Sequence, residues 1–149
     1  MSSRSALRRS LVALTFAAAV VPVAGSPATA AAAAVTPPIH LYDLSRHDSV
    51  KPRTFAVTQH DGLSALHWAH WGAKTQTGTG TMRINDCTPS CAEGHIRVLP
   101  GAHLQVRGTR VDQGRRYYRQ YRITHPAFTL QESRMYSQWT NAYVPSDFS

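Results

Sequence analysis

Residues 74–84, KTQTGTGTMRI, contain the pattern that decides the fold. Threonine alternates with glutamine and glycine, and Met82 and Ile84 continue the same alternation on one side. Side chains two residues apart lie on the same face of a strand, so this period predicts a β-strand with one apolar side. At Gly78 and Gly80 the missing side chains predict either a close backbone approach or a bulge.

The same period of two occurs on both sides of this segment. Apolar residues alternate with polar ones in four further places: Phe55 and Val57, Leu66 and Trp68, Ile96 and Val98, and Leu104 and Val106. Asp61-Gly62 and residues 112–114 are turn sequences. Short turns between such strands, with no helical stripe, predict an all-β fold, a small antiparallel β-sandwich or barrel.

The first 30 residues have the three parts of a secretory signal peptide. Arginines occupy positions 4, 8 and 9, an apolar stretch covers 11–24, and Ala28-Thr29-Ala30 offers a cleavage site. The apolar stretch is shorter than the roughly 18 residues that a spanning helix needs. We therefore expect a secreted protein, extracellular or associated with the cell wall, with no transmembrane segment. The paired arginines leave the choice between general and twin-arginine export open.

Cleavage after Ala30 leaves 119 of the 149 residues, enough for one domain. Residues 31–51 contain Pro37-Pro38 and scattered charges without a period, which predicts a flexible arm. Residues 52–149 are the predicted single β-domain, which we expect to be a monomer. The chain after the cut has 13 basic and 8 acidic residues, a formal charge of +5, and only two of the basic residues are lysines. This arginine-rich character suits contacts with carboxylates or phosphates.

The only cysteines, Cys87 and Cys91, lie in the heptapeptide NDCTPSC. Two nearby thiols normally join in an oxidising compartment, so we predict a disulfide that stiffens one loop. Zinc is the alternative, because Cys87, Cys91 and His95 form C-x3-C-x3-H beside Asp86. A closed zinc site needs four ligands, and the chain has no second cysteine pair.

One string of the sequence, LSALHWAHWG followed by TGTGTMRINDCTPSCAEGH, resembles a family of small secreted actinobacterial proteins of unknown function. The resemblance covers about residues 52–124. It is carried by these residues: Trp68, Trp71, Gly72, Gly78, Gly80, Asn85, Asp86, Cys87, Pro89, Cys91, Ala92 and Gly94. It implies an exported β-domain with one short disulfide, and it implies no activity.

The strongest candidate for a binding surface is residues 115–124, RRYYRQYRIT, in which arginines and tyrosines are interleaved. Arginine falls on both faces of such a strand, which predicts an edge strand or a bulge midway. The candidate binding residues are Trp71, Arg115, Tyr117, Arg119, Tyr121 and Arg122. An aromatic and basic surface of this kind fits an anionic cell-wall polymer, a carbohydrate or single-stranded nucleic acid.

Other aromatic and ionisable residues receive plainer interpretations. Trp68 shares a face with Leu66 and is expected in the core, whereas Trp71 beside Gly72 remains open between core and surface. His67 and His70 point to opposite faces of a strand and are expected on the surface.

A secreted hydrolase acting on phosphodiester or polysaccharide substrates is the alternative function. Its groups would be Glu93, His95, Arg97 and His125, whose mutual geometry the sequence leaves open. We assign no catalytic residue, metal or cofactor. The favoured hypothesis is a non-enzymatic binding or structural role at the cell envelope.

Overall fold

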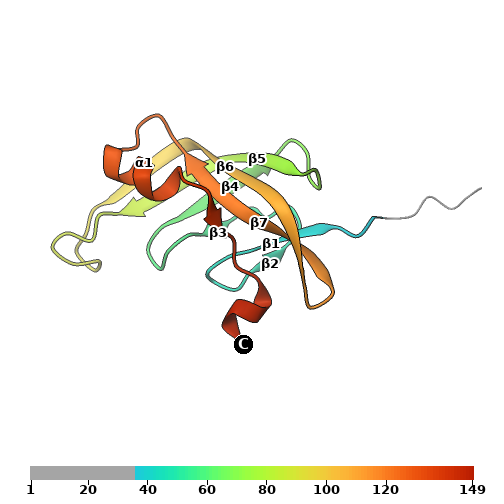
Figure 1. Cartoon of the computed structure of the whole chain (residues 1–149). Helices are drawn as coiled ribbons and strands as arrows, with labels where there is room; N and C mark the ends of the chain where they lie inside the picture. The colour runs from blue at the N-terminus through green and yellow to red at the C-terminus, as the bar shows by residue number, and fades with distance from the viewer. Residues whose placement is uncertain (1–35) are drawn as a thin grey trace, which may run out of the picture. The chain divides into compact units, whose positions relative to one another are not determined.

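The computed structural model describes residues 36–149, and the predicted signal peptide lies outside them. The elements of the fold are β1 (Ile39–Tyr42), β2 (Asp48–Ser49), β3 (Phe55–Ala56), β4 (Gly62–Trp68), β5 (Thr75–Asn85), β6 (Ile96–Asp112), β7 (Arg115–Thr124), α1 (Leu130–Tyr136), β8 (Thr140–Asn141) and the 3-10 helix η1 (Pro145–Phe148). Strands dominate the chain (Figure 1), which confirms the all-β prediction. No helix in this part is long and apolar enough to cross a membrane.

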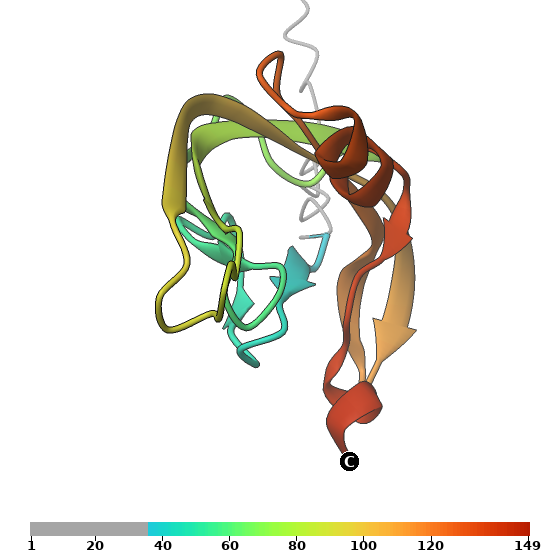
Figure 2. The ribbon, with the colours of Figure 1, turned by 90° about the vertical axis from the view of Figure 1, so that its left-hand side faces the viewer.

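One curled sheet makes up the fold (Figure 2). The strand order is β2-β1-β7-β6-β5-β4-β3, and β8 pairs with β7 beside β1. Neighbours are antiparallel except β1 and β7, which are parallel, with Ile39 opposite Arg116. The sheet is therefore mixed, not antiparallel throughout as expected, and it curls into a half-barrel over the main core.

Strand β5 has the predicted period of two. Its even-numbered residues from Gln76 to Ile84 are buried and its odd-numbered threonines face outward. The structure confirms the close approach predicted at both glycines, whereas the bulge beside Gly80 lies on the neighbouring strand β6. A Cβ at Gly78 would meet the Trp68 ring at 2.7 Å, and one at Gly80 would meet the Ser64 carbonyl at 2.6 Å. The register with β6 also shifts between Gly80 and Thr81.

This register shift decides which residues of β6 face the core. Thr81 is opposite Pro100 and Gly80 is opposite Ala102, so Gly101, at φ +83°, is the extra residue of a bulge. Leu99 and Ala102 are consequently buried. Ile96 and Val98 are exposed, although they are even-numbered like the buried Leu104 and Val106.

The predicted flexible arm is wrong over the described residues 39–51. β1 pairs with β7, and Ile39 and Leu41 are buried in the main core. The loop after β1 is held by the buried Asp43, whose two carboxylate oxygens accept hydrogen bonds from the backbone N–H groups of His47 and Ala56, each at 3.0 Å. The folded domain therefore begins before residue 52.

The C-terminal segment closes one end of the sheet. Thr129 and Glu132 form a capping box that starts α1, and the Glu132 carboxylate also pairs with Arg97 of β6. Partial burial opposes ionisation of Glu132, but the hydrogen bonds from Thr129 and Arg97 outweigh it, so the pKa of Glu132 is lowered. At the other end of the helix, the Tyr136 hydroxyl donates to the Asp61 carboxylate at 2.8 Å. These contacts anchor a helix that the sequence pattern did not predict.

Candidate functional site

Cys87 and Cys91 form the predicted disulfide in the loop between β5 and β6. The Asn85 side chain connects the two ends of the ring. Its Oδ1 accepts from the Cys87 N–H at 3.0 Å and its Nδ2 donates to the Cys91 carbonyl at 2.8 Å. The loop thus has a polar support in addition to the covalent bond.

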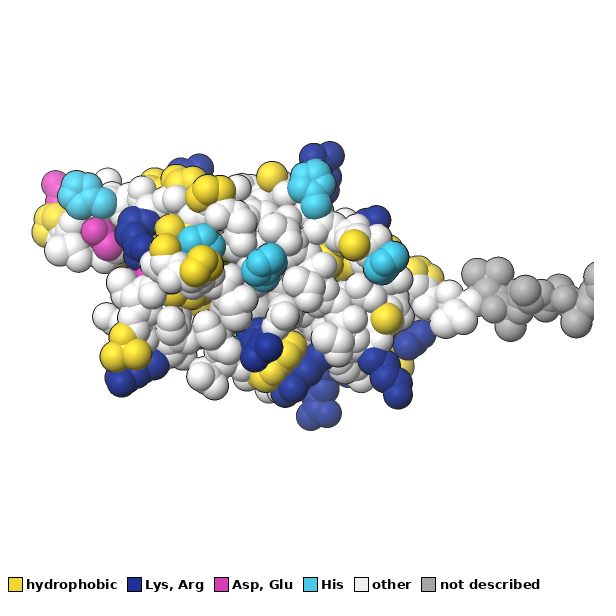
Figure 3. Space-filling view, turned by 90° about the horizontal axis from the view of Figure 1, so that it is seen from above, with side chains coloured by type: hydrophobic (Ala, Val, Ile, Leu, Met, Phe, Trp, Pro, Cys, Tyr) yellow, Lys and Arg dark blue, Asp and Glu magenta, His cyan; other side chains and the backbone are white. Residues whose placement is uncertain are grey.

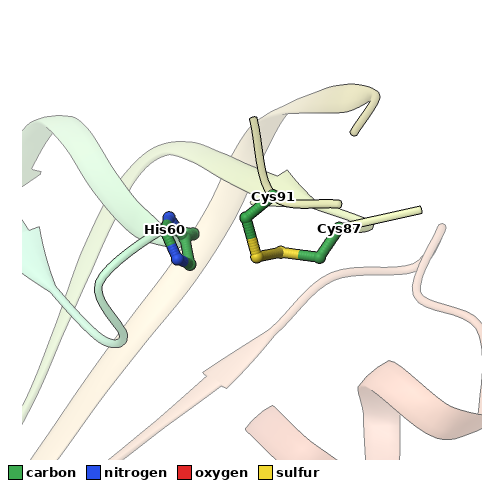
Figure 4. Close-up of side chains that lie close together, drawn as sticks. All are labelled: His60, Cys87 and Cys91. Carbon is green, nitrogen blue, oxygen red and sulfur yellow. A yellow bond between two sulfur atoms is a disulfide. The ribbon is translucent and has the colours of Figure 1, made fainter. Parts of the chain in front are cut away.

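The predicted zinc partners on this loop have structural roles. Asp86 accepts backbone hydrogen bonds from Thr88 and His95, and these two bonds lower the pKa of its carboxyl. His60, from the loop before β4, stands beside the disulfide instead of His95 (Figure 4). It is the histidine in the only group of three potential metal-ligating side chains in residues 36–149.

Strand β7 is central in the sheet, so the interpretation as an edge strand is wrong. It pairs with β6 on one side and with β1 and then β8 on the other, and its register with β6 is regular. Side chains on both faces are covered, because Tyr118 packs in the main core and Tyr117 packs in a second cluster with Tyr42 and Val144. This explains why tyrosines occur at both odd and even positions of β7.

The structure separates the residues of the predicted binding surface. Tyr117 and Tyr121 are buried, whereas Arg115 and Arg119 are exposed and Arg122 is partly exposed. Trp71 donates its indole N–H to the Ile39 carbonyl at 2.7 Å and packs edge-on against Trp68 and Tyr118, with ring centroids at 4.7 and 5.2 Å. Trp68 is in the core, as predicted, and His67 and His70 are exposed, as predicted.

Two of these residues meet at Asp48. One carboxylate oxygen of Asp48 lies 2.6 Å from His40 Nδ1, and the other accepts from Arg115 at 2.8 Å and from the Tyr117 hydroxyl at 3.1 Å. Burial and the hydrogen bond to Asp48 both raise the pKa of Tyr117. Asp48 therefore links β1, β2 and β7.

Three of the residues proposed for a hydrolase contact other groups and not one another. Arg97 pairs with Glu132 and donates to the Ala127 carbonyl. His125 lies 3.1 Å from the Pro100 carbonyl, and Glu93 contacts Ser90. Each of the eight carboxylates of the chain accepts at least one hydrogen bond within the protein. The acceptors are Asp43, Asp48, Asp61, Asp86, Glu93, Asp112, Glu132 and Asp147.

The outer face of the central sheet has an ordered arrangement of polar side chains. Cross-strand pairing places three residues from each of β5, β6 and β7 in three rows, which we call the polar lattice. The rows are Thr75, Arg107 and Gln120; Thr77, Gln105 and Arg122; and Thr79, His103 and Thr124. From the ordinary strand spacings the lattice measures about 10 Å across the strands and about 14 Å along them.

Side-chain hydrogen bonds fix the two arginines of the lattice. Arg122 donates from Nε to Gln105 at 2.6 Å, and Arg107 donates from Nε to Gln120 at 3.0 Å. Each bond joins directly opposed residues on neighbouring strands. The terminal nitrogens of both guanidinium groups remain outside these two bonds, so they are available for an anion.

Trp139 extends the lattice at β8. Its ring lies 4.0 Å from the Arg107 guanidinium carbon and 4.7 Å from that of Arg122. The register of β8 with β7, in which Thr140 is opposite Tyr121, brings Trp139 next to Arg122. The indole is partly exposed and its contacts are cation–π interactions.

The lattice is basic. Neither Arg107 nor Arg122 has a carboxylate within 4.0 Å among residues 36–149, and residues 1–35 contain no Asp or Glu. In the view from above, acidic side chains are visible only near one end, whereas arginine, lysine and histidine side chains are spread over the rest of the face (Figure 3).

Of the six predicted binding residues, only Arg122 belongs to the lattice. The alternation of Thr75, Thr77 and Thr79 was a usable signal for an exposed row, but it does not indicate which residues lie beside it. Arg107 and Trp139 are far from Arg122 in sequence and come together through the pairing of β6, β7 and β8.

No family model, curated protein or solved structure matched the chain. The resemblance to small secreted actinobacterial proteins therefore stays a prediction.

Proposed function

We propose that this protein is an exported, non-enzymatic binding domain of the cell envelope, and that the polar lattice holds an anionic wall polymer. The observation that carries the proposal is the pair Arg107 and Arg122. Both are oriented by glutamines, both stack on Trp139, and neither is neutralised by a carboxylate.

The chemistry of the lattice suits a polymer that carries phosphate or carboxylate groups on sugar or polyol units. Guanidinium groups bind such anions through paired N–H donors. Thr75, Thr77 and His103 are exposed and supply donors and acceptors for hydroxyl groups. The partly exposed indole of Trp139 supplies an apolar surface for a ring.

The shape of the site favours binding over turnover. The lattice is an open sheet face, which suits a chain that lies across it. The carboxylates that a hydrolase would use as acid or base are engaged in holding loops, as Asp43 and Asp61 illustrate. The predicted signal peptide and the disulfide support export.

The test is co-sedimentation of the exported protein with purified cell walls, before and after chemical removal of their anionic polymers, at increasing salt. We expect binding only to the walls that keep these polymers, and weaker binding as salt rises. R107Q/R122Q should weaken binding by up to roughly 30-fold, because two charge contacts at partly exposed side chains contribute about 1 kcal/mol each.

R53Q/R134Q is the matched control. It removes the same charge at two exposed arginines without a carboxylate partner, outside the lattice. An equal loss in both double variants would show that only net charge matters and would refute the lattice as the site. Tighter binding to single-stranded nucleic acid than to the wall polymer would refute the envelope role.

A hydrolase is the second candidate, and one observation favours it. A carboxylate beside one imidazole nitrogen, as in the pair Asp48 and His40, is an arrangement that orients histidine as a general base, and Arg115 lies on the same carboxylate. Turnover of RNA or of a wall glycan that is lost in H40A but kept in H95A would favour this candidate and refute the non-enzymatic proposal.

A further inference from the structure

Three side chains with metal-binding atoms meet at the corner between the β3–β4 and β5–β6 loops (Figure 4). One ligand atom each from His60, Cys87 and Cys91 lie within 4.8 Å of one another. His60 and Cys91 are exposed and Cys87 is partly exposed, so ions in solution can reach the group. The outer-face lattice involves none of these residues, and the corner is therefore a separate site.

The topology explains why His60 is here. β4 and β5 are antiparallel with Gly62 opposite Arg83. Continuing this register by two residues would bring His60 opposite Asn85, next to the cysteine loop. A hydrogen bond from the Asn85 N–H to Asp61 Oδ1, at 2.9 Å, joins the two loops at this point.

Both loops are held by hydrogen bonds that do not depend on the disulfide. Thr58 Oγ1 accepts from the N–H groups of His60 and Asp61 at 3.1 and 2.9 Å. On the other side, Asn85 bridges the backbone of Cys87 and Cys91. None of these hydrogen bonds involves a sulfur atom, so cleavage of the sulfur–sulfur bond removes none of them directly.

We propose that reduction of the disulfide turns this corner into a binding site for Zn²⁺, with Cys87, Cys91 and His60 as ligands and water at the fourth position. Two thiolates and one imidazole are ligands that zinc prefers, and three protein ligands plus water complete a tetrahedron. In tetrahedral geometry two zinc-bound sulfurs are about 3.8 Å apart, since each Zn–S bond is about 2.3 Å. The two sulfurs must therefore move apart from their bonded distance when the ring is opened.

The reaction balances with a dithiol as reductant. The dithiol gives two electrons and two protons to the cystine and becomes a cyclic disulfide, and Cys87 and Cys91 become thiols. Zn²⁺ then binds with release of these two thiol protons. The disulfide and the metal complex are thus alternative states of the same two side chains, and the compartment's redox state selects between them.

Titration with Co²⁺, a spectroscopic substitute for Zn²⁺, tests the proposal on the full exported chain. The protein is reduced with a dithiol, desalted without oxygen and titrated. We expect thiolate-to-cobalt charge-transfer absorption that saturates at one ion per chain and is abolished by Zn²⁺. The oxidised protein should give no such absorption, because it has no thiolate.

Two histidine variants decide which imidazole is the ligand. H60A should weaken Co²⁺ binding by roughly tenfold or more, since even residues that only support a ligand contribute about that much. H95A should change it by less than about twofold, although the spacing C-x3-C-x3-H points to His95 in the sequence. H60C should keep tight binding and increase the charge-transfer intensity, because it supplies a third thiolate.

The proposal fails if the reduced wild type gives no saturable charge-transfer absorption, or if the oxidised protein gives the same absorption. It also fails if H60A binds as tightly as the wild type, or if H95A loses as much affinity as H60A. Loss of binding in H60C, measured on a variant that keeps the wild-type circular dichroism, would overturn the role of position 60 as a ligand.

Discussion

Replacing Gly78 with alanine tests the close contact between β5 and the Trp68 ring in the core. A Cβ at this position would lie 2.7–2.9 Å from three atoms of the Trp68 indole. These distances are too short for carbon atoms, so the ring must move. Trp68 is buried, and its Nε1 donates to the Pro52 carbonyl at 2.7 Å. Overpacking costs about 1–3 kcal/mol, and loss of a buried hydrogen bond costs about 1–3 kcal/mol.

G78A should therefore reduce the free energy of unfolding by about 1–3 kcal/mol if the indole hydrogen bond survives and by about 2–6 kcal/mol if it is lost, measured by urea denaturation with circular dichroism as the signal. T77A is the matched control, because Thr77 is the neighbouring residue of the same strand and points outward. It should change the free energy of unfolding by less than about 1 kcal/mol.

A double-mutant cycle with Trp68 identifies the cause. In W68F/G78A the smaller ring leaves room for the added methyl group, so the loss of stability should be at least about 1 kcal/mol smaller than the sum of the two single losses. Additive effects, or a G78A protein as stable as T77A, would refute the steric explanation.

Two further changes test polar contacts of the core. D43N should lower the free energy of unfolding, measured in urea, by about 1–3 kcal/mol. The reason is that one of the two backbone N–H groups of His47 and Ala56 would then face an amide donor. A stability equal to wild type would contradict this role. Burial raises the pKa of Tyr136, whose hydroxyl donates to Asp61. At alkaline pH this phenol therefore stays neutral in the folded chain but ionises in the unfolded chain. Stability should therefore fall as pH rises above about 10, and Y136F should have a shallower slope in alkaline urea titrations; an unchanged slope would contradict the assignment.

The sequence predicted those parts of the fold that depend on near neighbours. The period of two in β5, the close approach at its glycines and the disulfide ring are each set by residues within a few positions. β1 was hidden because it has only four residues after a pair of prolines, and its partner β7 follows much later in the chain. The extra residue at Gly101 changes the alternation along β6, so Ile96 and Val98 before the bulge face the opposite side from Leu104 and Val106 after it.

The candidate site was harder to predict, for a related reason. A polar alternation such as Thr75, Thr77 and Thr79 is typical of any exposed strand face, so it does not distinguish a binding surface from a soluble one. The distinguishing feature is the position of Trp139 over Arg107 and Arg122, and this depends on the register of three strands. Likewise, the sequence of β7 suggests tyrosines that are available for stacking, whereas the structure buries Tyr117, Tyr118 and Tyr121.

The disulfide contributes less to the fold than its place in the motif suggests. Its ring spans a sequence separation of four, and such a small ring stabilises by roughly 2 kcal/mol in the chain-entropy model. The corner is also held by Asn85 and Asp61, which connect the cysteine loop to the residue before β4 and to Tyr136 of α1. Because these contacts are independent of the sulfur–sulfur bond, the cysteines are free to change partner while the sheet and its outer lattice keep their geometry.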